Sequence, residues 1–297
     1  MKILFFIENN WCYGKIHNEL IKVLYPEIYC DIIHWHGNFT VKDFEFFDQK
    51  YDYVLTSLSA IHILINDCKL NPKKIIATAH GDRDLIDYQE RNPNNEILDI
   101  GGYFVISKKL HELSIKFISR IPDILPIGTF TKNYPQNNNT CINNIGYFSI
   151  PSIYNHYNID IKRGHLVEKV ANEMKIPLIH STNSHFLGVE NLYKDISLLM
   201  FSSLTEGLPY ISTEAFSCGI PVLGTDVGTF SERIQNGGGY VLPFREEEYI
   251  IQACDLIKKI NSTDGLYQQL KQDATNIGIK YDWSNIRYDW INYFYSI

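Results

Sequence analysis

The chain has 297 residues, of which 45% are hydrophobic and 21% charged, as expected for a globular protein long enough to hold two domains. Its formal net charge of -7, with aromatic residues spread along the sequence, argues against a general nucleic-acid binder. No apolar run approaches the length of a membrane span.

The six cysteines contain no C-x-x-C pair and no compact spacing. Because several of them lie in apolar surroundings, we expect reduced, buried thiols and a cytoplasmic protein. The cysteines are Cys12, Cys30, Cys68, Cys141, Cys218 and Cys254.

The first half of the chain alternates short apolar runs with amphipathic stretches, and the first run meets Glu8 too early for a signal peptide. We expect strands at 3–7, 31–35, 53–58, 75–79, 103–107 and 124–127, with helices at 15–24, 59–68 and 108–118. Repeated alternation of this kind predicts a parallel, doubly wound, Rossmann-like sheet.

One of these helices, extended to residues 107–120, carries a basic face with Lys108, Lys109, Lys116 and Arg120. Such a face could rest on anionic lipid or receive an anionic acceptor. A basic face of this size is more often simply solvated, and we favour that interpretation.

After a polar segment at 135–140, the best candidate for a linker, the pattern of strands and helices restarts. We expect strands at 144–149 and 177–180, helices at 165–174 and 246–260, a short helical piece at 187–193 and a strand–loop–helix–strand unit at 196–223. In the tail, Trp283, Ile286, Trp290 and Phe294 are spaced by three and four, which predicts a helix with one apolar face.

Within the unit at 196–223, a buried strand is followed by a polar loop, a helix and a second strand. We expect Ser212 or Thr213 to cap the helix, and Gly219, followed by Pro221, to end it. A helix placed this way begins at the carboxyl end of the strand, where its N–H groups and its dipole attract an anion.

Two acids flank this expected anion site, Glu206 in the loop and Glu214 in the first helical turn, with seven residues between them. A carboxylate can accept hydrogen bonds from the vicinal hydroxyls of a sugar, so the local chemistry suggests a phosphate and a sugar. Alternatively, Glu214 is only a favourable acid at a helix N-terminus, and Glu206 is a solvated loop residue.

The acids belong to a longer pattern: Glu-Gly-Leu-Pro at 206–209, Glu-Ala-Phe at 214–216 and Cys-Gly-Ile-Pro-Val at 218–222, followed by Gly228, Glu232 and Gly237. This order resembles the donor-binding region of the retaining glycosyltransferases of family 4, with their E-x7-E motif. The resemblance implies an α/β GT-B fold, in which two Rossmann-like domains are joined and a C-terminal helix crosses back to the first.

For this chain the resemblance implies an N-terminal acceptor-binding domain at 1–135 and a nucleotide-sugar-binding domain at 141–280. The terminal helix at 281–297 would pack on the N-terminal domain.

The resemblance also implies roles for the motif residues. Glu214 would bind the nucleotide ribose, and Glu206 would act beside the transferred sugar. Backbone amides at Gly207, Leu208 and Pro209 would hold the hydroxyls of that sugar.

Around the diphosphate, the resemblance implies three contacts. Arg163, Lys162 beside it and the helix N-terminus at Ser212 would stabilise the leaving group, on which negative charge builds. The family also places an arginine after a glycine in the preceding strand, where this chain has Tyr147.

Two residues of the first domain are candidates as well. Gly14, in the turn after the first strand, could let backbone N–H groups approach a phosphate, although family members carry a glycine pair there and an ordinary turn explains Gly14 equally well. His80 ends the strand at 75–79, where a lone histidine is more often structural. With the resemblance, His80 becomes a catalytic candidate that binds the sugar or orients the acceptor.

Two patterns could hold a metal ion, and we set both aside. Asp82 and Asp84 match the D-x-D pattern of the other large glycosyltransferase fold, GT-A, but that fold does not explain the E-x7-E region. His34 and His36 lie on one side of a strand without a third ligand nearby.

The resemblance therefore implies a metal-independent, retaining glycosyltransferase without a cofactor, of the kind used in polysaccharide biosynthesis. Its donor would be a UDP- or GDP-linked sugar and its acceptor a glycan, a lipid-linked group or a protein. We expect it in the cytoplasm, with peripheral contact to the inner face of the membrane. Two alternatives stay open: a glycosyltransferase-like subunit that only binds a partner, and a sugar-nucleotide hydrolase or epimerase on the same fold.

Overall fold

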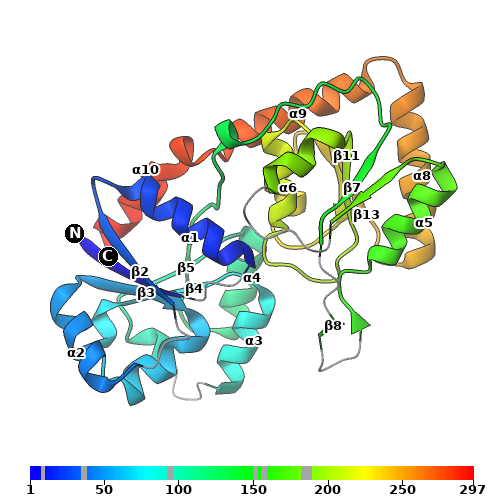
Figure 1. Cartoon of the computed structure of the whole chain (residues 1–297). Coiled ribbons are helices and arrows are strands. Elements are labelled where there is room, and N and C mark those ends of the chain that lie inside the picture. The colour runs from blue at the N-terminus through cyan, green and yellow to red at the C-terminus, as the bar shows by residue number, and fades with distance from the viewer. Residues whose placement is uncertain (8–10, 35–38, 92–95, 150–152, 155–158, 182–188) are drawn as a thin grey trace. The chain divides into compact units, whose positions relative to one another are not determined.

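The computed structural model describes residues 1–7, 11–34, 39–91, 96–149, 153–154, 159–181 and 189–297. The chain forms two compact units, the N-unit (Met1–Gly128 with Trp283–Ile297) and the C-unit (Thr129–Asp282) (Figure 1). Each unit contains its own parallel sheet flanked by helices, so the predicted pair of Rossmann-like folds is confirmed.

The N-unit is built on a parallel sheet with the strand order β2-β1-β3-β4-β5-β6. The strands are β1 (Lys2–Ile7), β2 (Tyr29–His34), β3 (Tyr53–Ser57), β4 (Ile75–Ala79), β5 (Gly102–Val105) and β6 (Asp123–Ile124). The order reverses at β1, because β2 pairs with one side of it and β3 with the other. Open α/β sheets bind ligands outside the carboxyl ends of their strands at such a reversal.

Helices cover both faces of this sheet, with α1 and α10 on one side and α2 and α3 on the other (Figure 1). The α-helices of the N-unit are α1 (Trp11–Leu24), α2 (Val41–Lys50), α3 (Asp82–Arg91), α4 (Lys108–Phe117) and α10 (Trp283–Ser296). Its shorter helical segments are η1 (Leu58–Ala60), η2 (Ile63–Asp67), η3 (Pro72–Lys74) and η4 (Glu96–Leu98).

The helix predicted at 59–68 is present but irregular. Residues 58–67 are helical throughout, as the 3₁₀ turn η1, two α-helical residues and the π-helix η2. Its apolar residues Leu58, Ile61 and Leu64 are all buried, so the predicted apolar face is correct and only the regularity of the helix differs.

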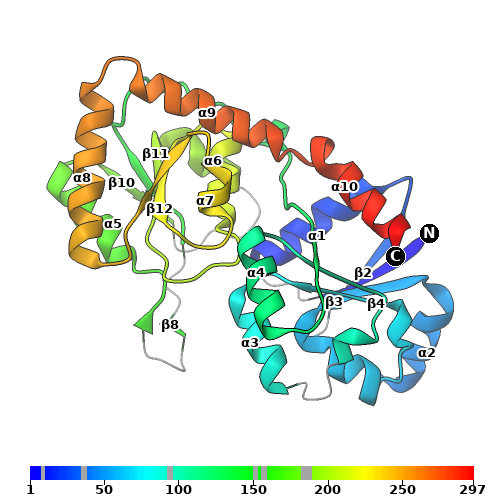
Figure 2. The same ribbon diagram turned by 180° about the vertical axis from the view of Figure 1, so that it is seen from behind.

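The terminal helix α10 packs on the N-unit, beside α1, as predicted (Figure 2). The four residues of its predicted apolar face are buried. Trp283 Nε1 donates to Glu19 Oε2 at 2.7 Å, and Trp290 Nε1 donates to the Pro126 carbonyl at 2.8 Å. The indole N–H groups are therefore satisfied inside the core that the rings fill.

The C-unit is built on a second parallel sheet, with the order β10-β7-β11-β12-β13. The strands are β7 (Ile145–Tyr147), β10 (Leu178–His180), β11 (Leu198–Phe201), β12 (Val222–Thr225) and β13 (Gly239–Leu242), and β8 (Ile153–Tyr154) pairs antiparallel with β9 (Ile159–Asp160). The helices are η5 (Thr131–Asn133), α5 (Gly164–Met174), η6 (Val189–Asp195), α6 (Tyr210–Ser217), α7 (Phe230–Arg233), α8 (Glu246–Ser262) and α9 (Leu266–Lys280).

Alternate residues of the central strand β11 point to opposite faces of this sheet and into two separate cores. Leu198 and Met200 join a cluster with side chains of α5 and α8. Leu199 and Phe201 join a second cluster, which includes residues of α6 and α9. The strand is buried on both faces, as a continuous apolar run in a parallel sheet predicts.

The polar segment predicted as a linker, 135–140, lies within the C-unit. Gln136 Nε2 donates to the Ser217 carbonyl at 3.0 Å, and Asn137 Nδ2 donates to the Gly219 carbonyl at 3.1 Å. Its side chains bind carbonyls at the end of α6 that have no partner within the helix. Composition alone does not distinguish such a polar segment from a linker.

Within the described ranges, none of the helices combines the length and the apolar character that a membrane crossing requires.

Candidate functional site

The unit at 196–223 folds as predicted into strand β11, a loop at 202–209, helix α6 and strand β12. The predicted N-cap is wrong, however, because α6 begins at Tyr210 directly after Pro209. Ser212 lies inside the first turn, fully buried, and its Oγ donates to the Pro209 carbonyl at 2.7 Å. Pro209 therefore occupies the N-cap position, and its side chain makes no cap hydrogen bond.

Two glycines shape the ends of this unit. Gly219 has φ +69 and ends α6, as predicted. Gly228 has φ +54, and a Cβ there would lie 2.2 Å from the Gly207 carbonyl oxygen. The turn after β12 therefore packs directly against the loop at 202–209 and holds it in place.

A second segment, 161–163, is hydrogen-bonded along the same loop. Leu204 N donates to the Ile161 carbonyl at 2.8 Å, Ser202 Oγ to the Arg163 carbonyl at 2.8 Å, and Arg163 Nε to the Ser202 carbonyl at 2.8 Å. These bonds join residues about forty positions apart and bring Lys162 and Arg163 beside the loop that carries Glu206.

Lys162 and Glu206 form an ion pair through Lys162 Nζ and Glu206 Oε1, and the same oxygen accepts a hydrogen bond from Ser203 Oγ at 2.9 Å. Their side chains are only 21% and 19% exposed. A partly buried pair of this kind fixes the positions of both side chains.

Arg163 precedes α5 in a left-handed conformation with φ +47, and the residue is only 5% exposed. Its Nε bonds the Ser202 carbonyl, and its Nη1 bonds the Phe244 carbonyl at 2.5 Å. Nη2 is buried and, among the described residues, has no hydrogen-bond partner. Burial lowers the pKa of this guanidinium. Carbonyl groups thus orient a buried cation whose remaining N–H donors could meet an anion.

Tyr147, at the position where the resembling family has an arginine, is buried at the end of β7. Its ring lies against Gly164, where a Cβ would come within 2.7 Å of it. Burial raises the pKa of the phenol to about 12. Tyr147 is therefore neutral and cannot supply the positive charge of an arginine.

Glu214 lies in the second turn of α6, rather than in the first turn as predicted, because the helix begins at Tyr210. Only 4% of its surface is exposed, and tyrosines bind both of its carboxylate oxygens. Tyr134 OH donates to Oε1 at 2.7 Å, and Tyr193 OH donates to Oε2 at 2.8 Å. Burial, reinforced by the charge of Glu214, raises the pKa of both phenols, so both stay protonated donors. Sequence analysis named neither tyrosine, and no motif marks them.

In the N-unit, His80 follows β4 and is buried, and its Nε2 has no hydrogen-bond partner in the described part of the chain. The ring of His17 lies 5.6 Å from its ring, between centroids, and His17 Nδ1 is 2.8 Å from the Tyr13 carbonyl. Burial lowers the pKa of both imidazoles, that of His17 to about 4. Both rings are neutral at pH 7.

The D-x-D pattern has a local role in helix capping. Asp84 Oδ2 accepts hydrogen bonds from His80 N at 2.7 Å and Gly81 N at 3.0 Å, the groups that lead into α3.

Gly14 lies inside the first turn of α1 rather than in the turn before it, and its carbonyl accepts from Asn18 Nδ2 at 2.7 Å. Residues 8–10 lie outside the described residues, as does His36 of the histidine pair.

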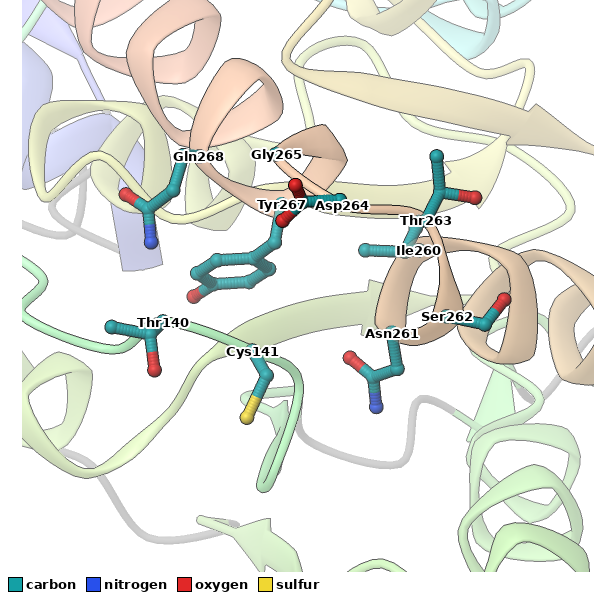
Figure 3. A pocket seen from close by; sticks show the side chains of 10 residues that line it. All are labelled: Thr140, Cys141, Ile260, Asn261, Ser262, Thr263, Asp264, Gly265, Tyr267 and Gln268. Carbon is teal, nitrogen blue, oxygen red and sulfur yellow. The ribbon is translucent and has the colours of Figure 1, made fainter.

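A hollow of about 270 Å³ lies elsewhere in the C-unit, between the α8–α9 connection and the segment before β7 (Figure 3). It is lined by residues that include Cys141, Asn261 and Tyr267. Cys141 precedes β7, whereas the loop at 202–209 follows β11. The hollow therefore lies at the amino ends of the parallel strands, and the loop lies at their carboxyl ends. The hollow is therefore separate from the acids and cations described above.

Residues 169–276 match the family described as Glycosyl transferases group 1. A search of curated protein sequences found no significant match.

Solved structures resemble the chain over its whole length. The sucrose-phosphate synthase of Thermosynechococcus elongatus is 10% identical with a TM-score of 0.74, and the match covers 100% of this chain and 98% of that one. Anabaena HepE, solved in complex with UDP, is 13% identical with a TM-score of 0.73 over 100% of both chains. The lipopolysaccharide outer core galactosyltransferase WaaB, in its apo form, is 13% identical with a TM-score of 0.67 over 100% of this chain and 99% of that one.

The shared fold is the two-unit GT-B architecture, and the family match falls on the C-unit, across both acids of the E-x7-E motif. Residues 169–276 therefore form a domain that matches the group 1 glycosyltransferases, and the whole chain has a GT-B fold.

Proposed function

We propose that the chain transfers a hexose from a UDP-linked donor to a glycan, lipid-linked or protein acceptor, without a metal ion. The observation that carries this proposal is the convergence of Lys162, Arg163 and Glu206 on one loop, just before the helix that carries Glu214. These groups lie at the carboxyl ends of parallel strands, where cations can bind a diphosphate and a carboxylate can bind the hydroxyls of a sugar. The choice of UDP is supported by Anabaena HepE, which was solved with UDP, with UDP and glucose, and with UDP-glucose.

In this proposal Arg163 meets the diphosphate through Nη2. When the bond between the sugar and the phosphate breaks, its electron pair stays on the phosphate oxygen, and a fixed cation stabilises that charge. Lys162 is a second cation near the leaving group, held by Glu206. The start of α6 adds its dipole, now from Tyr210 rather than from Ser212.

Glu206 acts beside the transferred sugar, and Glu214 accepts hydrogen bonds from the ribose hydroxyls. Backbone N–H groups for the sugar can come from Gly207 and Leu208 but not from Pro209, which has none.

In the N-unit, the neutral ring of His80 is a candidate to bind a hydroxyl of the sugar or of the acceptor, because its Nε2 is buried without a partner among the described residues. Gly14, inside α1, stays a weaker candidate for a phosphate contact at the start of that helix.

A second candidate function is that of a binding subunit without catalysis, which Tyr147 favours because it replaces a cation of the family pattern. The intact pair of acids and the oriented Arg163 favour the enzyme.

The first experiment is a calorimetric titration of the chain with UDP, GDP and their common sugar conjugates in the presence of a chelator. We expect UDP to bind, and Glu214→Ala to weaken binding by about 10- to 100-fold, because hydrogen bonds to a charged group are lost. Glu247→Ala, an acid whose side chain is 83% exposed in the same unit, is the matched control and should bind as the wild type does.

Release of UDP from the conjugate that binds best, assayed with candidate acceptors, separates the two candidate functions. Binding without turnover for any acceptor favours the subunit, and no binding of any nucleotide removes both donor-based proposals. Equal turnover with chelator or with added Mn²⁺ is expected for a metal-independent transferase, and loss of turnover in chelator would contradict that part of the proposal.

A further inference from the structure

Glu214, in the second turn of α6, differs from an ordinary helical acid in how completely its carboxylate is held. The two phenols come from different segments, Tyr134 directly after η5 and Tyr193 within η6. These tyrosines stand 80 and 21 residues away in the chain, and each bonds a different oxygen of Glu214. Two donors on two oxygens fix the plane of the carboxylate as well as its position.

The tyrosines are themselves held in place. Their rings meet edge to face with centroids 5.9 Å apart, and Phe148 packs edge to face on Tyr193 at 5.1 Å. The hydroxyl of Tyr193 also lies 3.2 Å from the Ile211 carbonyl, but its contact with Glu214 Oε2 is shorter, at 2.8 Å. Because the shorter contact has the normal length of an O–H···O hydrogen bond, the proton of Tyr193 is directed at Glu214.

A carboxylate accepts hydrogen bonds on both of its oxygens, and each tyrosine donates to one of them. Vicinal hydroxyls of a ribose need two acceptors at a fixed spacing, which a carboxylate of fixed plane supplies and a rotating one does not.

We propose that Tyr134 and Tyr193 are positioning residues that orient the Glu214 carboxylate toward the ribose hydroxyls, and so make the donor site selective for ribonucleotides over 2′-deoxyribonucleotides. This inference rests on the proposed function, in which Glu214 meets the ribose. It concerns selectivity between two nucleotides, so it can fail while the proposed function stands.

The experiment compares the dissociation constants of UDP and 2′-deoxy-UDP by calorimetry for the wild type, Tyr134→Phe, Tyr193→Phe and the double variant. We expect the wild type to prefer UDP by about 10- to 100-fold, as the loss of a hydrogen bond to a charged group predicts. In the double variant the preference should fall to about threefold or less, with the single variants between. Glu214→Ala should show no preference.

The matched control is Tyr267→Phe. Tyr267 is a buried tyrosine of the same unit, and its hydroxyl donates to the Ser197 carbonyl at 2.8 Å and accepts from Asn137 Nδ2 at 2.9 Å rather than bonding Glu214. This variant should lose thermal stability and keep the wild-type ratio. A purely structural role for Tyr134 and Tyr193 would weaken both nucleotides equally and leave the ratio unchanged, which would overturn the inference.

The remaining outcomes are distinct. If the wild type binds UDP and shows no preference, the ribose assignment and the inference fail together while nucleotide binding stands. If the wild type binds neither nucleotide, the proposed function itself fails. Should the double variant lose its near-ultraviolet circular dichroism, the single variants, which each keep one donor, decide the question by the same ratio.

Discussion

At the scale of single residues, the charged groups of the C-unit occupy defined positions. Glu206 accepts from Ser203 and pairs with Lys162, whereas Glu214 accepts from two neutral phenols. The two acids of one motif therefore differ in what they can do. Glu206 pairs with Lys162 in a loop at the carboxyl ends of the strands. Glu214 is buried, and its carboxylate is a hydrogen-bond acceptor held in one orientation.

This difference predicts the effect of Glu206→Gln. The variant keeps the size of the side chain and removes the charge that holds Lys162, so turnover should fall by roughly 100-fold or more while the dissociation constant of UDP changes by about threefold or less. Steady-state kinetics and calorimetry measure the two effects. Equal losses in both would argue against a place beside the reacting sugar.

At the scale of elements, the site depends on how closely the turn after β12 approaches the loop at 202–209. Gly228 combines a positive φ with a contact to the Gly207 carbonyl, so a side chain there would be both strained and without space. Gly265, before α9, has φ +73 but open space around it.

The two glycines form a matched pair for a test. Gly265→Ala should cost about 1 kcal/mol, because only backbone strain is added. Gly228→Ala should cost at least about 2 kcal/mol more, because the loop must shift, and it should weaken UDP binding as well. Thermal unfolding and calorimetry check both effects, and similar losses in the two variants would mean that the contact with Gly207 is unimportant.

In the N-unit, α1 is fixed near the end of β4 through two buried, neutral histidines, and this makes stability depend on pH. The folded pKa of His17, about 4, lies below its ordinary value of 6.5, so the unfolded chain takes up the proton first. The stability due to neutral His17 is complete above pH 6.5 and is lost as the pH falls from 6.5 toward 4. The pKa of His80 is lowered in the same direction.

We expect His17 alone to cost about 2 kcal/mol of unfolding free energy when the pH falls from 7.5 to 5. Urea unfolding at the two pH values measures the loss. In His17→Gln, which cannot take up a proton, the loss between the same pH values should be smaller by about that amount. An unchanged pH dependence in this variant would show that His17 is not the group responsible.

At the scale of the whole molecule, the N-unit is assembled from both ends of the chain, whereas the C-unit is one continuous stretch. Trp290 of α10 is buried and packs on Phe104 of β5 with ring centroids 5.1 Å apart. Residues of α10 therefore pack in the same core as the strands of the N-unit.

A substitution that weakens the packing of α10 should therefore lower the stability of the N-unit and leave that of the C-unit unchanged. Trp290→Ala should destabilise the N-unit by about 3–5 kcal/mol, because a large buried side chain is removed. Tyr288→Ala, at a position 58% exposed on the same helix, is the control and should change little. In Trp290→Ala, hydrogen exchange should speed up in β1 and β5 and stay slow in β11 and β12, and faster exchange throughout would mean that the units unfold together.

The sequence by itself determined the parts of this protein that depend on local pattern. Apolar runs and helical spacing are local properties, so the parallel sheets, the buried strand β11 and the apolar face of α10 could be predicted. The order of acids, glycines and prolines from Glu206 to Gly237 indicated a resemblance to the family 4 glycosyltransferases. Such an order is a local property too, because these residues form the turns and the helix start of one supersecondary unit.

Only the tertiary structure decided which groups meet. The pairing of Lys162 with Glu206, and of Tyr134 and Tyr193 with Glu214, joins segments far apart in the chain. The sequence does not distinguish a solvated tyrosine or lysine from one that is buried against a carboxylate. The start of α6 at Tyr210 and the 3₁₀ and π segments near Ile61 were missed for a related reason: several local geometries fit the same residues, and packing selects among them.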